Sequence, residues 1–184
     1  MALKEVAIVG LSTTTHDQAP FWKGTEMWGL PWDEGYWRQY SRLFEMHDIK
    51  LLTDVECRKE GYLDRLRDCD TILYMQEAYF PSATAFPFEE VAKVTGEYWN
   101  SSIAYMLALA ITENYEKISI YGVDMRAEEE YFYQRPNCEY LIGLARSKGI
   151  DVAIPDESPL CKFDGRAIRY GRELQTYPKR YGKL

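Results

Sequence analysis

The sequence lacks the patterns that mark several large classes of protein. Its longest apolar run, at about residues 103–111, is shorter than the ~20 residues that a helix needs to cross a bilayer. The opening stretch MALKEVAIVG has neither the basic region nor the long apolar region of a secretory signal. We therefore expect a cytoplasmic protein with no membrane partner.

Cysteine pairs, histidine and glycine are scarce where cofactor sites need them. The four cysteines lie far apart, at positions 57, 69, 138 and 161, whereas a zinc site takes closely spaced ligand pairs. The two histidines are too few for the ligand set of a metal phosphohydrolase. Gly10 is the only glycine of its loop, so neither a G-x-G-x-x-G nor a Walker motif is present. We predict reduced thiols and no metal site, and these motifs identify no cofactor.

Charge is divided unevenly along the chain. Over 184 residues, 22 Lys and Arg stand against 29 Asp and Glu, a net charge of −7. This balance argues against a protein that coats nucleic acid nonspecifically, because such binding rests on cationic contacts to phosphates. Residues 162–184 carry +5, which leaves −12 on the residues before them. We predict a single folded domain over 1–161 and a basic, tyrosine-bearing tail or oligomerisation arm over 162–184.

Aromatic side chains are abundant, with 15 Tyr, 7 Phe and 5 Trp. Tyr and Trp favour places where one end of the side chain is apolar and the other meets water, such as interfaces and ligand clefts. The aromatic residues gather at 22–40, 80–88 and 131–133 and in the tail. We expect this excess to form cleft walls and contacts in a homo-oligomer more than core packing.

Short apolar runs alternate with segments of helical spacing along the chain. Such alternation indicates βαβ units and a Rossmann-like α/β fold, with a mostly parallel sheet flanked by helices. The predicted strands cover 6–9, 26–30, 71–75, 117–121 and 151–154, with a marginal one at 51–52. The predicted helices cover 34–46, 58–67, 100–114 and 136–148, and loops are expected at 80–88 and 127–135.

Four segments fall beyond the carboxyl ends of the predicted strands, where an open parallel sheet binds its ligands. Gly10, Ser12 and Thr13 follow the first strand and form either an ordinary turn or a cradle of hydroxyl and N–H groups for an anion. Asn100–Ser102 opens the long apolar helix, whose N-terminal amides and dipole favour a phosphate. Simple capping would account for one of those three side chains.

The other two segments follow the predicted strand that ends at position 121. Asp124 comes just after Gly122 and is either an acceptor for a ribose or substrate hydroxyl or a cap for backbone groups. Tyr131, Tyr133 and Arg135 offer phenols and a guanidinium to a phosphate or a ring. An aromatic interface between subunits is the competing interpretation of that last segment.

A general base has two candidates in the sequence. His16 lies just after the first loop, and Asp124 lies beyond a strand end. A packed and hydrogen-bonded histidine is the alternative interpretation of His16.

The ordered segments resemble those of one group of enzymes. The loop Gly10-Leu-Ser-Thr-Thr14, the helix start Asn100-Ser-Ser102, the strand end Tyr121-Gly-Val-Asp-Met125 and the turn at 155–160 follow one another in the same order. The pattern is similar to that of bacterial lipooligosaccharide sialyltransferases, motility-associated-factor glycosyltransferases and archaeal-type 6-hydroxymethylpterin pyrophosphokinases. Phage-encoded proteins look similar too. Residues 100–160 match best.

This resemblance implies a nucleotide or nucleotide-sugar ligand. Family members bind it through the first loop, the helix start and the segment after the strand. The implied binding residues are Gly10, Ser12, Thr13, Asn100, Ser101, Ser102, Gly122 and Asp124, with Ser158 in the closing turn. The resemblance also implies that Tyr131 and Tyr133 assist the leaving phosphate.

We therefore expect a small transferase, glycosyltransferase-like or phosphotransferase-like, that acts on a nucleotide-activated donor. The leaving phosphate would lie on the Asn100–Ser102 helix start, beside Arg135. The alternative is a non-catalytic protein that binds or sequesters a nucleotide. A departure from the family motivates it: the sialyltransferases place a catalytic histidine shortly before the last helix, and residues 131–136 contain none.

The tail interleaves Tyr170, Tyr177 and Tyr181 with lysines and arginines. This pattern fits stacking on single-stranded nucleic acid, or an arm that wraps over the acidic body of a neighbouring subunit. We favour the arm.

Deletion of Asp164–Leu184 tests the arm. The deletion removes the basic segment that would contact an acidic neighbour, so the molar mass measured by light scattering is expected to fall. An unchanged oligomer would contradict the arm. Binding of a single-stranded oligonucleotide by the full chain, and not by the truncated one, would favour the stacking interpretation instead.

Overall fold

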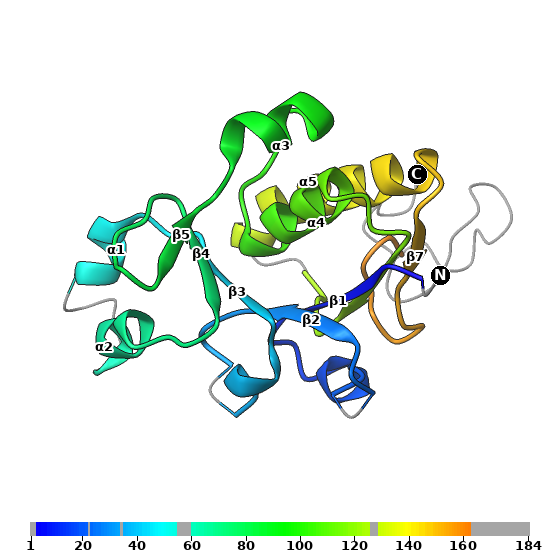
Figure 1. Cartoon of the computed structure of the whole chain (residues 1–184). Coiled ribbons are helices and arrows are strands. Elements are labelled where there is room, and N and C mark those ends of the chain that lie inside the picture. The colour runs from blue at the N-terminus through cyan, green and yellow to red at the C-terminus, as the bar shows by residue number, and fades with distance from the viewer. Residues whose placement is uncertain (1–2, 22, 34, 55–59, 126–128, 163–184) are drawn as a thin grey trace, which may run out of the picture.

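The strands form one sheet in which every pairing is parallel (Figure 1). The structure is a computed structural model and describes residues 3–21, 23–33, 35–54, 60–125 and 129–162. Apart from Lys162, the predicted tail lies outside these residues. The strands are β1 (Glu5–Val9), β2 (Glu26–Gly29), β3 (Arg42–Glu45), β4 (Ile72–Met75), β5 (Ala83–Ala85), β6 (Lys117–Tyr121) and β7 (Asp151–Ala153). Their order across the sheet is β5-β4-β3-β2-β1-β6-β7.

Strand β1 lies inside the sheet, between β2 and β6, and both of its faces are buried. Val6 and Ile8 pack into the core on one face, whereas Ala7 and Val9 pack into the core on the other. All four side chains are at most 1% exposed. A strand whose two faces are both covered has a continuous run of apolar residues. The prediction of a strand at 6–9 is confirmed.

Helices cover both faces of the sheet (Figure 1). The face that carries Val6 and Ile8 is covered by α3 (Phe88–Thr95), α4 (Ser102–Thr112) and α5 (Glu129–Ser147). The other face is covered by α1 (Ile49–Thr53), α2 (Tyr62–Arg67) and two 3-10 turns. These layers confirm the predicted Rossmann-like α/β fold. No helix among the described residues combines the length and the apolar character needed to cross a membrane.

Helix α4 is apolar around its whole circumference and lies in the core. Eight of its residues are buried, as expected for a helix without a polar face. It contacts β1 and β3 of the sheet and lies between α3 and α5. The predicted helix start at Asn100–Ser102 is confirmed, because Ser101 is the N-cap and Ser102 the first helical residue.

The helix predicted at 34–46 is wrong. The segment contains a 3-10 turn at Trp37–Gln39 and then strand β3. Leu43 and Phe44 point to opposite faces of the sheet and enter different cores. The aromatic residues of this segment mimic a helical spacing, but strand alternation decides the structure once both faces are covered.

Other predicted boundaries also shift. The loop predicted at 127–135 is wrong from Glu129 onward, because α5 begins there and Pro136 lies inside the helix rather than at its first position. The loop predicted at 80–88 contains β5, and Leu51 and Leu52 belong to α1 rather than to a strand.

The prediction that aromatic side chains serve clefts more than the core is wrong in part. Among the described residues, Trp28, Tyr62, Tyr115 and Phe44 are the largest side chains that are fully buried. Tyr62 and Tyr115 reach this depth because their hydroxyls donate hydrogen bonds to Glu45 and Glu26, which removes the cost of burying a phenol.

Two glycines meet where β1 and β6 end. The Gly10 N–H donates to the Tyr121 carbonyl at 2.9 Å, and the Ser12 N–H donates to the Gly122 carbonyl at 2.8 Å. A Cβ at position 10 would lie 2.5 Å from the Gly122 carbonyl oxygen, and one at 122 would lie 2.4 Å from that of Gly10. The Thr15 hydroxyl fixes the contact by accepting the Gly122 N–H at 2.8 Å.

Alanine at position 122 is expected to destabilise the fold. Gly122 has a φ of +62°, which costs other residues about 1–2 kcal/mol, and the backbone clash adds about 1–3 kcal/mol. Gly149→Ala is the matched control, since Gly149 has a φ of +83° and, apart from its two chain neighbours, no atom lies within 4 Å of its added Cβ. In urea unfolding, the free energy of unfolding should fall more for Gly122→Ala than for the control, by at least about 1 kcal/mol. Equal losses would mean that the close approach is unimportant.

Candidate functional site

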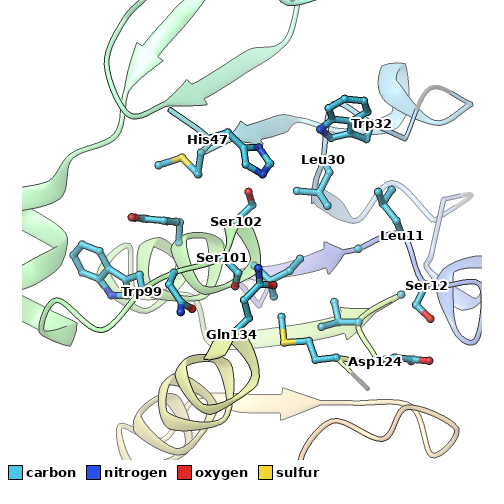
Figure 2. A pocket seen from close by; sticks show the side chains of 18 of the residues that line it. Leu11, Ser12, Leu30, Trp32, His47, Trp99, Ser101, Ser102, Asp124 and Gln134 are labelled. Carbon is cyan, nitrogen blue, oxygen red and sulfur yellow. The ribbon is translucent and has the colours of Figure 1, made fainter. Parts of the chain in front are cut away.

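A pocket opens where the strand order reverses. The chain steps outward from β1 to β5, and α4 then carries it back to β6 on the other side of β1. Ligands of open α/β sheets bind at such a switch point, beyond the carboxyl ends of the strands. The pocket has a volume of about 910 Å³ and is lined by the segments after β1, β2, β3, β4 and β6 and by the start of α4 (Figure 2).

The first loop forms one wall of the pocket. Gly10, Ser12 and Thr13 line it, together with Gly122 and Asp124 from the segment after β6. The structure thus brings five of the predicted binding residues together at the meeting of β1 and β6.

A threonine hydroxyl links the two segments of this wall. Thr14 Oγ1 donates to Asp124 Oδ2 at 2.6 Å and lies 3.3 Å from Ser12 Oγ. The Asp124 carboxylate, which follows β6, is therefore oriented by a hydroxyl from the loop that follows the neighbouring strand β1.

The start of α4 forms a second wall. Asn100, Ser101 and Ser102 all line the pocket, and Figure 2 shows Ser101 and Ser102 at the beginning of the helix. Ser101 Oγ accepts the Ala104 N–H at 3.2 Å, and Asn100 Nδ2 donates to the Tyr133 carbonyl at 3.1 Å. Capping thus explains Ser101. The amides at the first helical positions have no acceptor within a helix, so this wall presents donors to the pocket.

The remaining lining is mostly apolar, with aromatic rings among aliphatic side chains, and almost uncharged. Trp32, Trp99 and Tyr105 line the pocket, and His47 and Asp124 are the other ionisable groups in its described lining. Burial raises the pKa of Tyr105, so its phenol stays protonated. No lysine or arginine lines the pocket in the described part of the chain.

Metal-binding side chains are not grouped anywhere in the described ranges. No three His, Cys, Asp or Glu side chains of those ranges are placed to hold a metal ion.

Several predicted residues lie away from the pocket lining. The Arg135 guanidinium donates to the Pro159 and Lys162 carbonyls at 2.8 and 2.5 Å and pairs with Glu139 at 2.7 Å. It therefore holds the segment after β7 against α5, rather than facing the pocket.

Ser158 also has an internal partner. Its buried hydroxyl donates to the Val123 carbonyl at 2.8 Å and so fastens the closing turn to the segment after β6. Tyr133 is 67% exposed and does not line the pocket, where its neighbour Gln134 does. The backbone of Tyr131 lies in α5, and its side chain lies outside the described residues.

His16 is buried and does not line the pocket. Its Nε2 lies 2.7 Å from Asp33 Oδ2, and its Nδ1 lies 3.1 Å from Asp17 Oδ1. Burial opposes a charge on the ring, but the hydrogen bonds and charges of Asp33 and Asp17 outweigh it and raise the pKa of His16. Tyr40 also donates a hydrogen bond to Asp33.

The candidate base His16 is therefore a packed and paired histidine in this structure. The second histidine, His47, lines the pocket instead. Sequence reasoning did not select it, because the strand that ends at Glu45 was predicted as part of a helix. A correct strand there would have placed His47 at a carboxyl end, which was the available signal.

Comparisons with known proteins identify the fold. No protein-family model matches the sequence, and no curated protein matches it. An apo α-2,3-sialyltransferase from Campylobacter jejuni matches with a TM-score of 0.50 and 13% identity, over 83% of this chain and 75% of that one. The chain shares the fold of this sialyltransferase.

Two further sialyltransferase structures match with TM-scores of 0.49 and 0.48. One is CstII from Campylobacter jejuni in complex with CMP-3FNeuAc, and the other is CST-II with a trisaccharide acceptor and CMP. Each is 14% identical, over 85% of this chain and 82% of its own.

The pairing of His16 predicts a pH-dependent contribution to stability. A pKa raised above 6.5 in the folded state means that folding favours the imidazolium, so the stabilisation is complete below pH 6.5 and is lost as the pH rises through the raised value. The stability advantage of the wild type over His16→Gln, measured by urea unfolding, should thus shrink from pH 6 to pH 9. Gln18→Asn, in the same turn, is the control. Its free energy of unfolding should differ from that of the wild type by the same amount at every pH in this range.

Proposed function

We propose that the protein is a transferase that binds a nucleotide sugar and holds the departing phosphate at the start of α4. The observation that carries this proposal is the pocket at the switch point, where the first loop, the segment after β6 and Asn100–Ser102 converge. Helix N-termini and loop amides of this kind bind phosphate without requiring a cationic side chain.

The size and the fold support the same class of ligand. Small-molecule pockets typically enclose about 300–1,000 Å³, and the volume of about 910 Å³ suits a nucleotide joined to a sugar. The chain also shares its fold with a sialyltransferase, an enzyme that transfers a sugar.

Each wall of the pocket suits one part of such a donor. The Ser102 and Ile103 amides and the positive end of the α4 dipole suit the phosphate. The Asp124 carboxylate, oriented by Thr14, suits a ribose hydroxyl. Trp99 and the other aromatic rings of the lining offer flat apolar surfaces to a base or a sugar.

A negative charge at the helix start is expected to weaken nucleotide binding without unfolding the protein. Ser102→Asp places a carboxylate in the pocket, and like charges repel, so the Kd for the best binder among CMP, CDP, UDP, GDP and ATP should rise by at least about tenfold. The same change favours the helix, because acidic residues stabilise the first turn. Titration calorimetry and a thermal melt measure the two effects.

Thr84→Asp is the matched control for this experiment. Thr84 is exposed on β5 and does not line the pocket. Its replacement by aspartate adds the same charge as Ser102→Asp and should leave the Kd unchanged. Absence of binding by the wild type to all five nucleotides would overturn the proposed function. A nucleotide sugar that binds and is returned intact would reduce the function to sequestration.

A further inference from the structure

A buried carboxylate lies behind the pocket wall. Glu45, the last residue of β3, is 1% exposed. One of its oxygens accepts a hydrogen bond from the Tyr62 hydroxyl, and the other bonds to Nδ1 of His47. The backbone N–H of His47 also donates to that second oxygen, at 3.2 Å. A buried charge is costly unless it is paired, and these three donors supply the pairing.

The donors to Glu45 are themselves held in place. Tyr62 is fully buried, and burial and the charge of Glu45 raise its pKa, so it remains a phenol that donates. The Trp32 ring stacks on Tyr62 with 4.1 Å between ring centroids and also lines the pocket. Asp48 caps α1 by accepting the Lys50 N–H at 2.7 Å, which turns the chain directly after His47.

His47 joins this buried group to the pocket. Its side chain is 47% exposed and lines the pocket, although its Nδ1 contacts a carboxylate that is 1% exposed. Figure 2 shows the imidazole directed into the space that Ser102 borders from the start of α4. His16, the other histidine, is absent from the lining.

We propose that His47 is the catalytic base of the transfer reaction and that Glu45 is the residue that positions it. This inference rests on the proposed function and adds to it the residue that activates the acceptor. The acceptor is then a compound that attacks through a hydroxyl group, or water in the hydrolytic side reaction.

The chemistry follows from the tautomer that Glu45 selects. The Glu45 carboxylate accepts a hydrogen bond from Nδ1, so in the neutral ring Nδ1 carries the hydrogen and Nε2 carries the lone pair. Nε2 takes the proton of the acceptor hydroxyl while the acceptor oxygen bonds to the anomeric carbon of the donor. The bond from that carbon to the phosphate oxygen breaks, its electron pair stays on the nucleotide phosphate, and Glu45 stabilises the imidazolium.

Kinetics of the full chain test this assignment. Nucleotide release from CMP-, UDP- and GDP-sugars is followed with water and with simple glycosides as acceptors. His47→Ala is expected to lower kcat by about 100-fold or more, the usual contribution of general base catalysis, with less than about threefold change in the KM for the donor. Added imidazole should restore part of kcat, because the side chain that it replaces borders an open pocket. His16→Ala is the matched control and should show no rescue.

The positioning role of Glu45 has its own readout. Glu45→Gln keeps the shape of the side chain but removes the charge that fixes the tautomer, so kcat should fall by at least about tenfold and the nitrogen NMR signals of the His47 ring should shift. A thermal melt shows whether the variant remains folded.

The outcomes separate this inference from the proposed function. If the wild type binds nucleotides and turns over a donor, but His47→Ala keeps its kcat or loses donor binding in the same proportion, the assignment of His47 is overturned and the proposed function stands. Binding without turnover of any donor also overturns the assignment. Failure of the wild type to bind any nucleotide overturns the proposed function, and the base with it.

Discussion

The contact between Gly10 and Gly122 is the constraint on which the site depends. Each glycine lies where a Cβ would strike the backbone of the other, so β1 and β6 end closer together than strands with side chains at these positions could. This close approach lets Thr14 reach Asp124 and lets Thr15 reach the Gly122 amide. The chain therefore needs no glycine-rich motif, because one glycine from each strand end makes the space that such a motif makes within a single loop.

The charge distribution of the pocket suits a ligand with two different ends. The described lining offers amides and a helix dipole at the start of α4, but no lysine or arginine. A helix dipole stabilises a nearby charge by about 0.3–1 kcal/mol at an exposed site and by up to about 2 kcal/mol at a partly buried one. Because this interaction is weak, an anion held there can also leave. The carboxylate of Asp124 would repel that anion, and it lies on another wall, where hydroxyl donors fit.

The parts of the fold that could be predicted are those in which the spacing of apolar residues fits only a strand or only a helix. Strands β1 and β6 are short apolar runs, and α4 is an apolar segment with a serine cap, so their places followed directly. Strand β3 was missed because its apolar residues continue an aromatic series that has helical spacing by coincidence. That error hid His47, since a residue directly after a buried strand is a candidate for the site and one in mid-helix is not.

The two histidines show why a site cannot be assigned from residue type alone. Each is bonded to a carboxylate that also accepts a hydrogen bond from a tyrosine: His16 to Asp33 with Tyr40, and His47 to Glu45 with Tyr62. The chemistry of the two groups is nearly the same, but their placement differs. His16 is buried and has carboxylates at both nitrogens, so protonation strengthens the fold, whereas the ring of His47 borders the pocket. The arrangement of the strands, and not the residues themselves, decides which of the two histidines borders the pocket.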